Sequence, residues 1–132
     1  MKKLLFICVG NSCRSQMAEG FARHYGKDYV EVKSAGTQPA IDVAPLAIRA
    51  MKEKGIDISD QRPDMLTMEM LSDTDVVISM GCGVEESCPM PLRSDTEDWG
   101  LGDPIGQPIE VYRQVRDEIE KRVKELLKGI NP

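Results

Sequence analysis

The sequence predicts an α/β fold in which a central parallel four-stranded sheet lies between two layers of helices, with residues 1–132 forming one domain. Three observations predict it. Residues 3–9 are expected to form the first strand, and their apolar run from Leu4 to Val9 is typical of a central parallel strand that is covered on both faces. Segments with helical periodicity alternate with short strand-like segments along the chain. A long amphipathic helix is expected from Gln107 to Lys128.

The segment after the first strand predicts a helix at residues 14–26. Met17, Phe21 and Tyr25 recur at helical spacing, so they are expected to share its buried face. Gly26 is expected to end this helix, because glycine tolerates the backbone geometry of helix ends. The elements expected after it are a strand at 29–33, a turn at 34–36, a helix at 45–55, a loop at 56–64, a short helix at 65–71, a strand at 75–80 and a short strand within 93–101.

The residues between the first strand and this helix predict a binding site for a tetrahedral oxyanion. Cys8 lies at the carboxyl end of the strand, where a tight loop and a helix start would surround it with backbone N–H groups. Arg14 can hold two oxygens in its planar fork, and a hydroxyl of Ser15 or Ser12 would favour the Cys8 thiolate. Cys8 is therefore the expected nucleophile. The expected oxyanion-binding set is Val9, Gly10, Asn11, Ser12, Cys13 and Arg14.

Nucleophilic attack on an oxyanion also requires an acid that protonates the departing oxygen. Asp103 is the candidate, because it lies in a glycine-containing loop that Trp99 could anchor, directly before Pro104. The glycines would allow this loop to close over the site.

Cys82 and Cys88 are further candidates for catalysis. The third expected strand ends just before Cys82, so if it neighbours the first strand, Cys8 and Cys82 lie at one edge of the sheet, with the strand backbones about 4.8 Å apart. On a helix, Cys82 and Cys88 would lie about 9 Å apart along the axis, whereas a disulfide needs Cα atoms within about 7 Å. Oxidation of the pair would therefore unwind such a helix.

Composition excludes several other classes of function. The formal net charge is −5 and no basic stripe is visible, which argues against nucleic acid as a partner. No apolar segment is long enough to cross a membrane and no export signal is recognised, so a cytoplasmic monomer is expected. The cysteines, at positions 8, 13, 82 and 88, lack the spacing of zinc ligands, and His24 is the single histidine.

These motifs together resemble the thioredoxin-coupled arsenate reductases, which share the fold of the low-molecular-weight protein tyrosine phosphatases. The resemblance extends over nearly the whole chain. It rests on C-V-G-N-S-C-R-S-Q-M-A-E-G, S-A-G, G-I-D-I-S, the Cys82 and Cys88 pair, and W-G-L-G-D-P followed by V-R-D-E-I.

The resemblance implies a role in arsenic detoxification, with arsenate reduced to arsenite. Cys8 would attack arsenate that the loop and Arg14 hold, while Asp103 protonates the leaving oxygen. Cys82 would then form a disulfide with Cys8, and Cys88 would move it to Cys82–Cys88, where thioredoxin reduces it. No tightly bound cofactor is implied, but family members bind potassium, and the matching oxygens belong to Asn11, Glu19, Ser34 and Asp64.

Two alternatives stay open at this stage. The first is a low-molecular-weight protein tyrosine phosphatase that works through a phosphocysteine at Cys8. The second is a non-catalytic redox sensor that reports oxidation through Cys82 and Cys88, which would leave Arg14 and Asp103 without a role.

Overall fold

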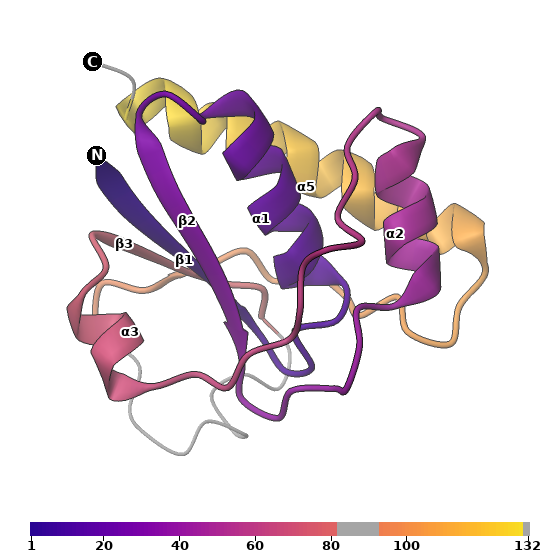
Figure 1. The fold of residues 1–132 in the computed structure, drawn as a ribbon, viewed down its shortest axis with the longest axis horizontal. Helices are drawn as coiled ribbons and strands as arrows, with labels where there is room; N and C mark the ends of the chain where they lie inside the picture. The colour runs from indigo at the N-terminus through magenta and orange to yellow at the C-terminus, as the bar shows by residue number, and fades with distance from the viewer. Residues whose placement is uncertain (82–92, 131–132) are drawn as a thin grey trace.

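The computed structural model describes residues 1–81 and 93–130. Cys82 and Cys88 lie outside the described residues. The sheet is parallel throughout and its strands have the order β2-β1-β3-β4, which confirms the predicted four-stranded parallel sheet (Figure 1). The strands are β1 (Lys2–Cys8), β2 (Val30–Gly36), β3 (Val76–Ser79) and β4 (Glu97–Asp98), and the helices are α1 (Arg14–Tyr25), α2 (Pro45–Lys52), α3 (Met68–Ser72) and α5 (Ile109–Ile130).

Helices cover both faces of the sheet. Alternate residues of β1 point to opposite faces, as the two-residue period of a strand requires. Leu4 and Phe6 join the larger core with side chains of α1, α2 and α5, whereas Leu5 and Ile7 join a smaller core with Leu71 of α3. Each fully buried side chain of this size stabilises the fold by about 1.5–3 kcal/mol. The apolar run of β1 thus reflects its central position.

Strand register brings the carboxyl ends of β1, β2 and β3 to one edge of the sheet. Cys8 is paired with Gly36 of β2, and the preceding Ile7 is paired with Ser79 of β3. The first and third strands are therefore neighbours. The chain leaves this edge of β1 through residues 9–13 and enters α1, so Cys8 lies where ligands bind in parallel sheets.

The predicted turn at residues 34–36 is wrong, because β2 continues through these residues. Ser34, Ala35 and Gly36 are paired with the last three residues of β1. Met65 also forms a parallel bridge with Gly36, so this end of β2 has a partner on each side. Pairing on both sides outweighs the turn preference of small residues. Met65 was expected in the short helix, which instead begins at Met68, after Thr67 accepts a hydrogen bond from the Met70 N–H.

Tyr25 was expected in the core, but it lies at the surface. Its ring stacks on Phe21 with centroids 6.2 Å apart, and its hydroxyl donates to Glu120 of α5 at 2.6 Å. The helix ends at Tyr25 itself, so the last member of the predicted stripe reaches past the core to the neighbouring helix. Tyr25 thus packs its apolar ring on α1 and donates its polar hydroxyl to α5, at the edge where the two helices meet.

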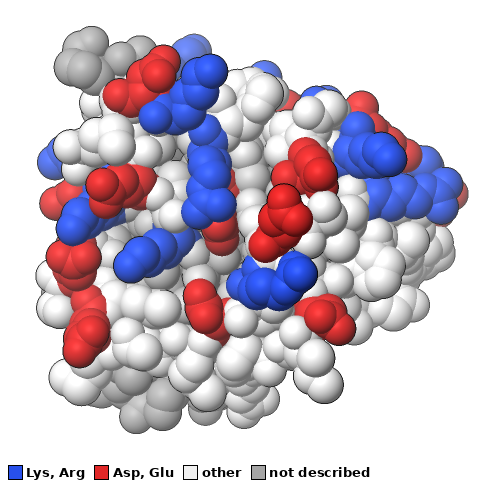
Figure 2. Space-filling view, viewed as in Figure 1, with Lys and Arg blue, Asp and Glu red and all other residues white. Residues whose placement is uncertain are grey.

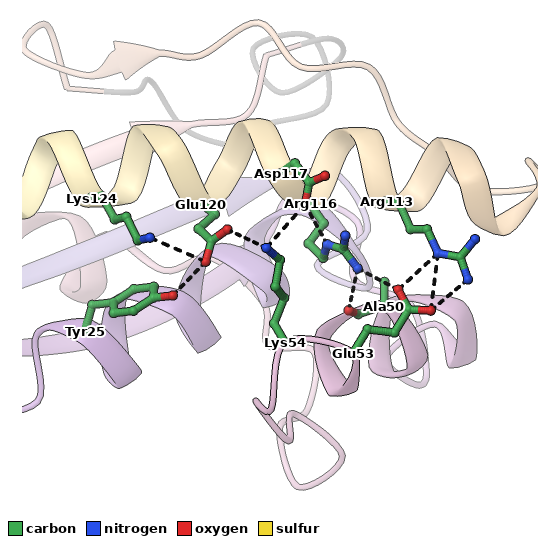
Figure 3. Close-up of polar contacts among 9 residues, drawn as sticks. All are labelled: Tyr25, Ala50, Glu53, Lys54, Arg113, Arg116, Asp117, Glu120 and Lys124. Carbon is green, nitrogen blue, oxygen red and sulfur yellow. Dashed lines mark hydrogen bonds and ion pairs between the residues drawn. The ribbon is translucent and has the colours of Figure 1, made fainter.

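A chain of polar contacts joins α5 to the ends of α1 and α2 (Figure 3). Arg116 is buried within the apolar stripe of α5 and donates to the Ala50 carbonyl at 2.9 Å and to Glu53 at 2.7 Å. Arg113 holds the other oxygen of Glu53 at 2.7 Å, and these two arginines lower the pKa of Glu53 to about 2. The long helix is thus fixed in register against α2 by charge as well as by packing.

Acidic and basic side chains are interspersed on the face shown in Figure 2. Among residues 1–81 and 93–130, no helix combines the length and the apolar content that a membrane span requires.

Candidate active site

Cys8 lies at the start of a tight loop, residues 9–13, that joins β1 to α1 and is called the anion loop below. The Asn11 N–H donates to Cys8 Sγ at 3.1 Å, and Ser15 Oγ lies 2.8 Å from the same sulfur. Ser15 Oγ also accepts from Asn11 Nδ2 at 2.6 Å, and when Cys8 is a thiolate, which can only accept, the Ser15 hydroxyl donates to the sulfur. Two donors thus converge on Cys8 Sγ, which is an arrangement that suits a thiolate.

The anion loop presents backbone donors without partners. Among the described residues, no acceptor takes the N–H groups of Gly10, Ser12, Cys13 or Arg14. Asn11 makes the tight turn possible with a φ of 50°, in the left-handed region that asparagine tolerates better than most residues. These donors lie at the amino end of α1, where the helix dipole also favours negative charge.

Arg14 begins α1 and is almost completely buried. Its Nη1 donates to the Leu101 carbonyl at 2.8 Å, and its Nη2 lies 3.8 Å from a carboxylate oxygen of Asp103. Its Nε has no partner in the described part of the chain. A buried guanidinium with an unused N–H donor favours the binding of an anion, because leaving such a donor unpaired costs free energy.

Asp103 lies on the loop between β4 and α5, about half exposed, and the Ile105 N–H donates to it at 3.1 Å. The sequence-predicted nucleophile loop, arginine and acid are thus brought near one another: Arg14 links the anion loop to the Asp103 loop. The positions of Cys82 and Cys88 relative to them lie outside the described residues.

Cys13 differs sharply from Cys8 in its surroundings. Its sulfur lies 3.8 Å from Ser12 Oγ and 3.9 Å from the Tyr112 hydroxyl, and burial raises the pKa of its thiol to about 11. A thiol with this pKa stays protonated at neutral pH. Cys13 therefore packs as a small apolar group at the start of α1 rather than serving as a second nucleophile.

The four residues expected to hold potassium form one polar cluster behind the anion loop. Asn11 Nδ2 donates to Ser34 Oγ at 3.0 Å, Ser34 Oγ donates to Glu19 at 2.5 Å, and the Asp64 N–H donates to Asn11 Oδ1 at 2.8 Å. Arg23 pairs with the other oxygen of Glu19 at 2.7 Å. Burial raises the pKa of Glu19, although Ser34 and Arg23 oppose this effect.

Sequence reasoning missed two contributors to the site. The Leu101 carbonyl gives no sequence signal, since every residue carries one. Gln16 is fully buried and donates to the Asn11 carbonyl, and its signal was a long polar residue directly before Met17 on the inward face of α1. Gly36 lies close enough to the anion loop that no side chain fits between them.

Comparisons with known proteins show which family this chain resembles in sequence and in fold. The profile of the low molecular weight phosphotyrosine protein phosphatases matches residues 3–132. The glutaredoxin arsenate reductase of Synechocystis sp. is 46% identical over 132 residues, which cover 99% of this chain and all of that protein. A solved arsenate reductase in the phosphate-binding state has a TM-score of 0.86 and 44% identity, covering 99% of this chain and 100% of its own. A low molecular weight protein tyrosine phosphatase from T. tengcongensis also gives 0.86, with 31% identity over 98% of this chain and 99% of its own. The chain belongs to the low molecular weight phosphotyrosine protein phosphatase family.

Proposed function

We propose that this protein is an arsenate reductase in which Cys8 is the nucleophile. The observation that carries the proposal is the pair of donors on Cys8 Sγ, beside a loop with unpartnered backbone N–H groups and a buried Arg14 that keeps an unused donor. Arsenate is a tetrahedral oxyanion, so its oxygens match donors arranged in this way. The Synechocystis relative is named an arsenate reductase, and its name supports arsenate as the substrate here.

The first step forms a bond between Cys8 sulfur and arsenic and breaks one arsenic–oxygen bond. The anion loop and Arg14 hold the remaining oxygens, and Asp103 donates a proton so that the leaving oxygen departs as water. Asp103 lies 3.8 Å from Arg14 Nη2, so one loop movement is able to bring both groups to the same oxyanion.

The second step transfers two electrons to arsenic. Cys82 sulfur attacks Cys8 sulfur, and the electron pair of the sulfur–arsenic bond stays with arsenic, which leaves as arsenite. Cys88 then attacks Cys82, which releases the Cys8 thiolate and leaves a Cys82–Cys88 disulfide. A dithiol carrier reduces that disulfide; thioredoxin is our first expectation, and the name of the Synechocystis relative adds a glutaredoxin-type carrier as the second.

A phosphatase activity is the second candidate function, and the family itself favours it. Phosphate and arsenate have the same shape and charge, so the anion loop should accept both. Hydrolysis of a phosphate ester needs Cys8, Arg14 and Asp103 but no further thiol. The two cysteines Cys82 and Cys88 therefore distinguish reduction from hydrolysis.

A potassium ion behind the anion loop is part of the proposal. Asn11, Ser34, Glu19 and Asp64 carry hard oxygen atoms within one connected cluster, and hard oxygens are the ligands that such cations prefer. An ion there would fix Asn11 and Ser15 from behind. We expect a higher melting temperature in potassium chloride than in sodium chloride at equal ionic strength, and Glu19→Gln should abolish the difference.

The test is arsenate-dependent NADPH consumption with thioredoxin or glutaredoxin and the matching reducing system. Cys8→Ser should lose all turnover, and Cys82→Ser and Cys88→Ser should lose multiple turnover while keeping hydrolysis of p-nitrophenyl phosphate. That retained hydrolysis is the control for folding. Full multiple turnover in Cys88→Ser would overturn the relay, and absence of arsenate turnover with either carrier would leave the phosphatase.

A further inference from the structure

We propose that Gln16 is a positioning residue that sets the direction of the peptide between Asn11 and Ser12, so that the Ser12 N–H faces the anion. This inference deepens the proposed function and rests on it, because it concerns how the same loop binds oxyanions. It starts from a side chain that touches no reacting atom and is nonetheless fully buried.

The side-chain amide of Gln16 is hydrogen-bonded on both ends. Its Nε2 donates to the Asn11 carbonyl at 2.9 Å and to the Arg62 carbonyl at 3.1 Å, so both of its hydrogens are used. Its Oε1 accepts from Gln61 Nε2 at 2.7 Å. Apolar residues fill buried helix positions at lower cost, so a buried amide with three partners indicates a specific role for its polar atoms.

The contact to Asn11 fixes a peptide plane. A trans peptide holds its C=O and the following N–H in opposite directions. Since Gln16 holds the Asn11 carbonyl toward the protein interior, the Ser12 N–H points the other way, and no described residue accepts from it. Asn11 has a φ of 50°, a left-handed backbone conformation that costs free energy. Such a conformation persists when surrounding contacts, such as the one from Gln16, hold it in place.

Gln16 also connects the anion loop to residues 61–64, which pass behind it. Gln61 donates to both the backbone carbonyl and the side chain of Gln16, and the Asp64 N–H donates to Asn11 Oδ1 at 2.8 Å. Asn11 is thus held at its carbonyl by Gln16 and at its side chain by Asp64. Both anchors depend on one segment, so a disturbance of residues 61–64 should reach the anion loop through Gln16.

Three variants separate the contacts. Gln16→Met keeps the size of the side chain and removes all three hydrogen bonds, whereas Gln16→Glu keeps the acceptor for Gln61 and removes both donors at neutral pH. Gln61→Ala removes only the outer partner. Gln114→Met is the matched control, because Gln114 is exposed on α5 and far along the chain from the loop.

The direct measurement is a titration of the reduced, full-length protein with inorganic phosphate, followed by the amide signal of Ser12 in nitrogen-15 NMR. In the wild type and in Gln114→Met, the Ser12 amide proton should shift strongly on binding. In Gln16→Met this shift should be lost and the Kd for phosphate should rise about tenfold, the equivalent of one hydrogen bond to a charged group. Gln16→Glu should lose the shift too, and Gln61→Ala should weaken binding less.

Turnover gives the second measurement. A donor that binds the oxyanion equally in the ground and transition states affects KM rather than kcat, so Gln16→Met should raise KM for arsenate about tenfold and change kcat less than twofold. Unchanged phosphate affinity and an unchanged Ser12 shift in both Gln16 variants would overturn the inference. Normal phosphate binding by the wild type without arsenate turnover would instead count against the proposed function alone.

Discussion

Replacing Gly36 with alanine should displace the anion loop by a distance that the structure defines. Gly36 ends β2 and is paired with Cys8, and the loop passes directly over it. A Cβ at this position would lie 2.7 Å from the Val9 carbonyl oxygen, 2.9 Å from Asn11 Cβ and 3.2 Å from Asn11 N. Two of these atoms are backbone and the third is a Cβ, so a rotamer change relieves none of the contacts.

The magnitude follows from ordinary contact distances. Non-bonded heavy atoms pack at about 3.5 Å or more, so β2 and the anion loop must separate by roughly 0.8 Å. Overpacking of this kind costs about 1–3 kcal/mol of stability. Because a displacement of about 1 Å in a positioned site can cost about a hundredfold in rate, we expect phosphate affinity and arsenate turnover to fall by about 10- to 100-fold.

Urea denaturation and phosphate titration measure the two effects separately. Gly129→Ala is the matched control, since a Cβ there meets no atom within 4 Å and Gly129 lies inside α5. That control should keep phosphate affinity and gain up to about 1 kcal/mol from helix propensity. If Gly36→Ala binds phosphate as tightly as the wild type, the loop tolerates the methyl group and the steric reasoning is refuted.

Three further predictions concern reactivity and stability. At pH 8, iodoacetamide should leave Cys13 unmodified in the native protein, because burial raises its pKa to about 11, and peptide mapping by mass spectrometry would detect any alkylation. Arg113 and Arg116 lower the pKa of Glu53 from 4.5 to about 2, so the ionised carboxylate should stabilise the fold fully above about pH 4.5 and lose this effect as the pH falls toward 2. In urea unfolding, the free energy of unfolding should therefore fall less over that pH interval in Glu53→Gln than in the wild type. Ile119→Ala in the core should cost about 2–5 kcal/mol, whereas the same change at exposed Ile41 should stay within about 0.5 kcal/mol, as denaturant midpoints would show.

The sequence predicted the sheet well because its strongest signals were local. The apolar run of β1 reflects burial on both faces, and this property is visible without knowing its neighbours. The small residues Ser34 to Gly36 misled the prediction, since their size suits both a turn and a close approach to another segment. Here the approach of the anion loop explains them, and that cause lies about 25 positions earlier in the chain.

The geometry of the candidate site was predictable from the sequence for the side chains that the structure brings together, and not for the backbone groups beside them. The expected residues Cys8, Arg14 and Ser15 have reactive or charged groups at a recognisable spacing. The partner of Arg14 is the Leu101 carbonyl, which any residue would supply. The role of Gln16 was not predicted, because helical periodicity records burial but not which backbone carbonyl a buried amide meets.

Anion binding and folding should be coupled, because the contacts that shape the anion loop come from distant parts of the chain. Arg14 is held by Leu101, 87 positions away, and Asn11 by Asp64, 53 positions away. A chain that lacks these tertiary contacts does not assemble the donors, so phosphate should bind only the native state. At a concentration a hundredfold above its Kd, phosphate should therefore add about 2.7 kcal/mol to the free energy of unfolding, measured in urea against phosphate-free buffer at constant ionic strength. Gly36→Ala should shift that gain to higher phosphate concentrations in proportion to its weaker Kd. An equal gain in the two proteins at a phosphate concentration between their two Kd values would mean that phosphate stabilises the fold somewhere other than the anion loop.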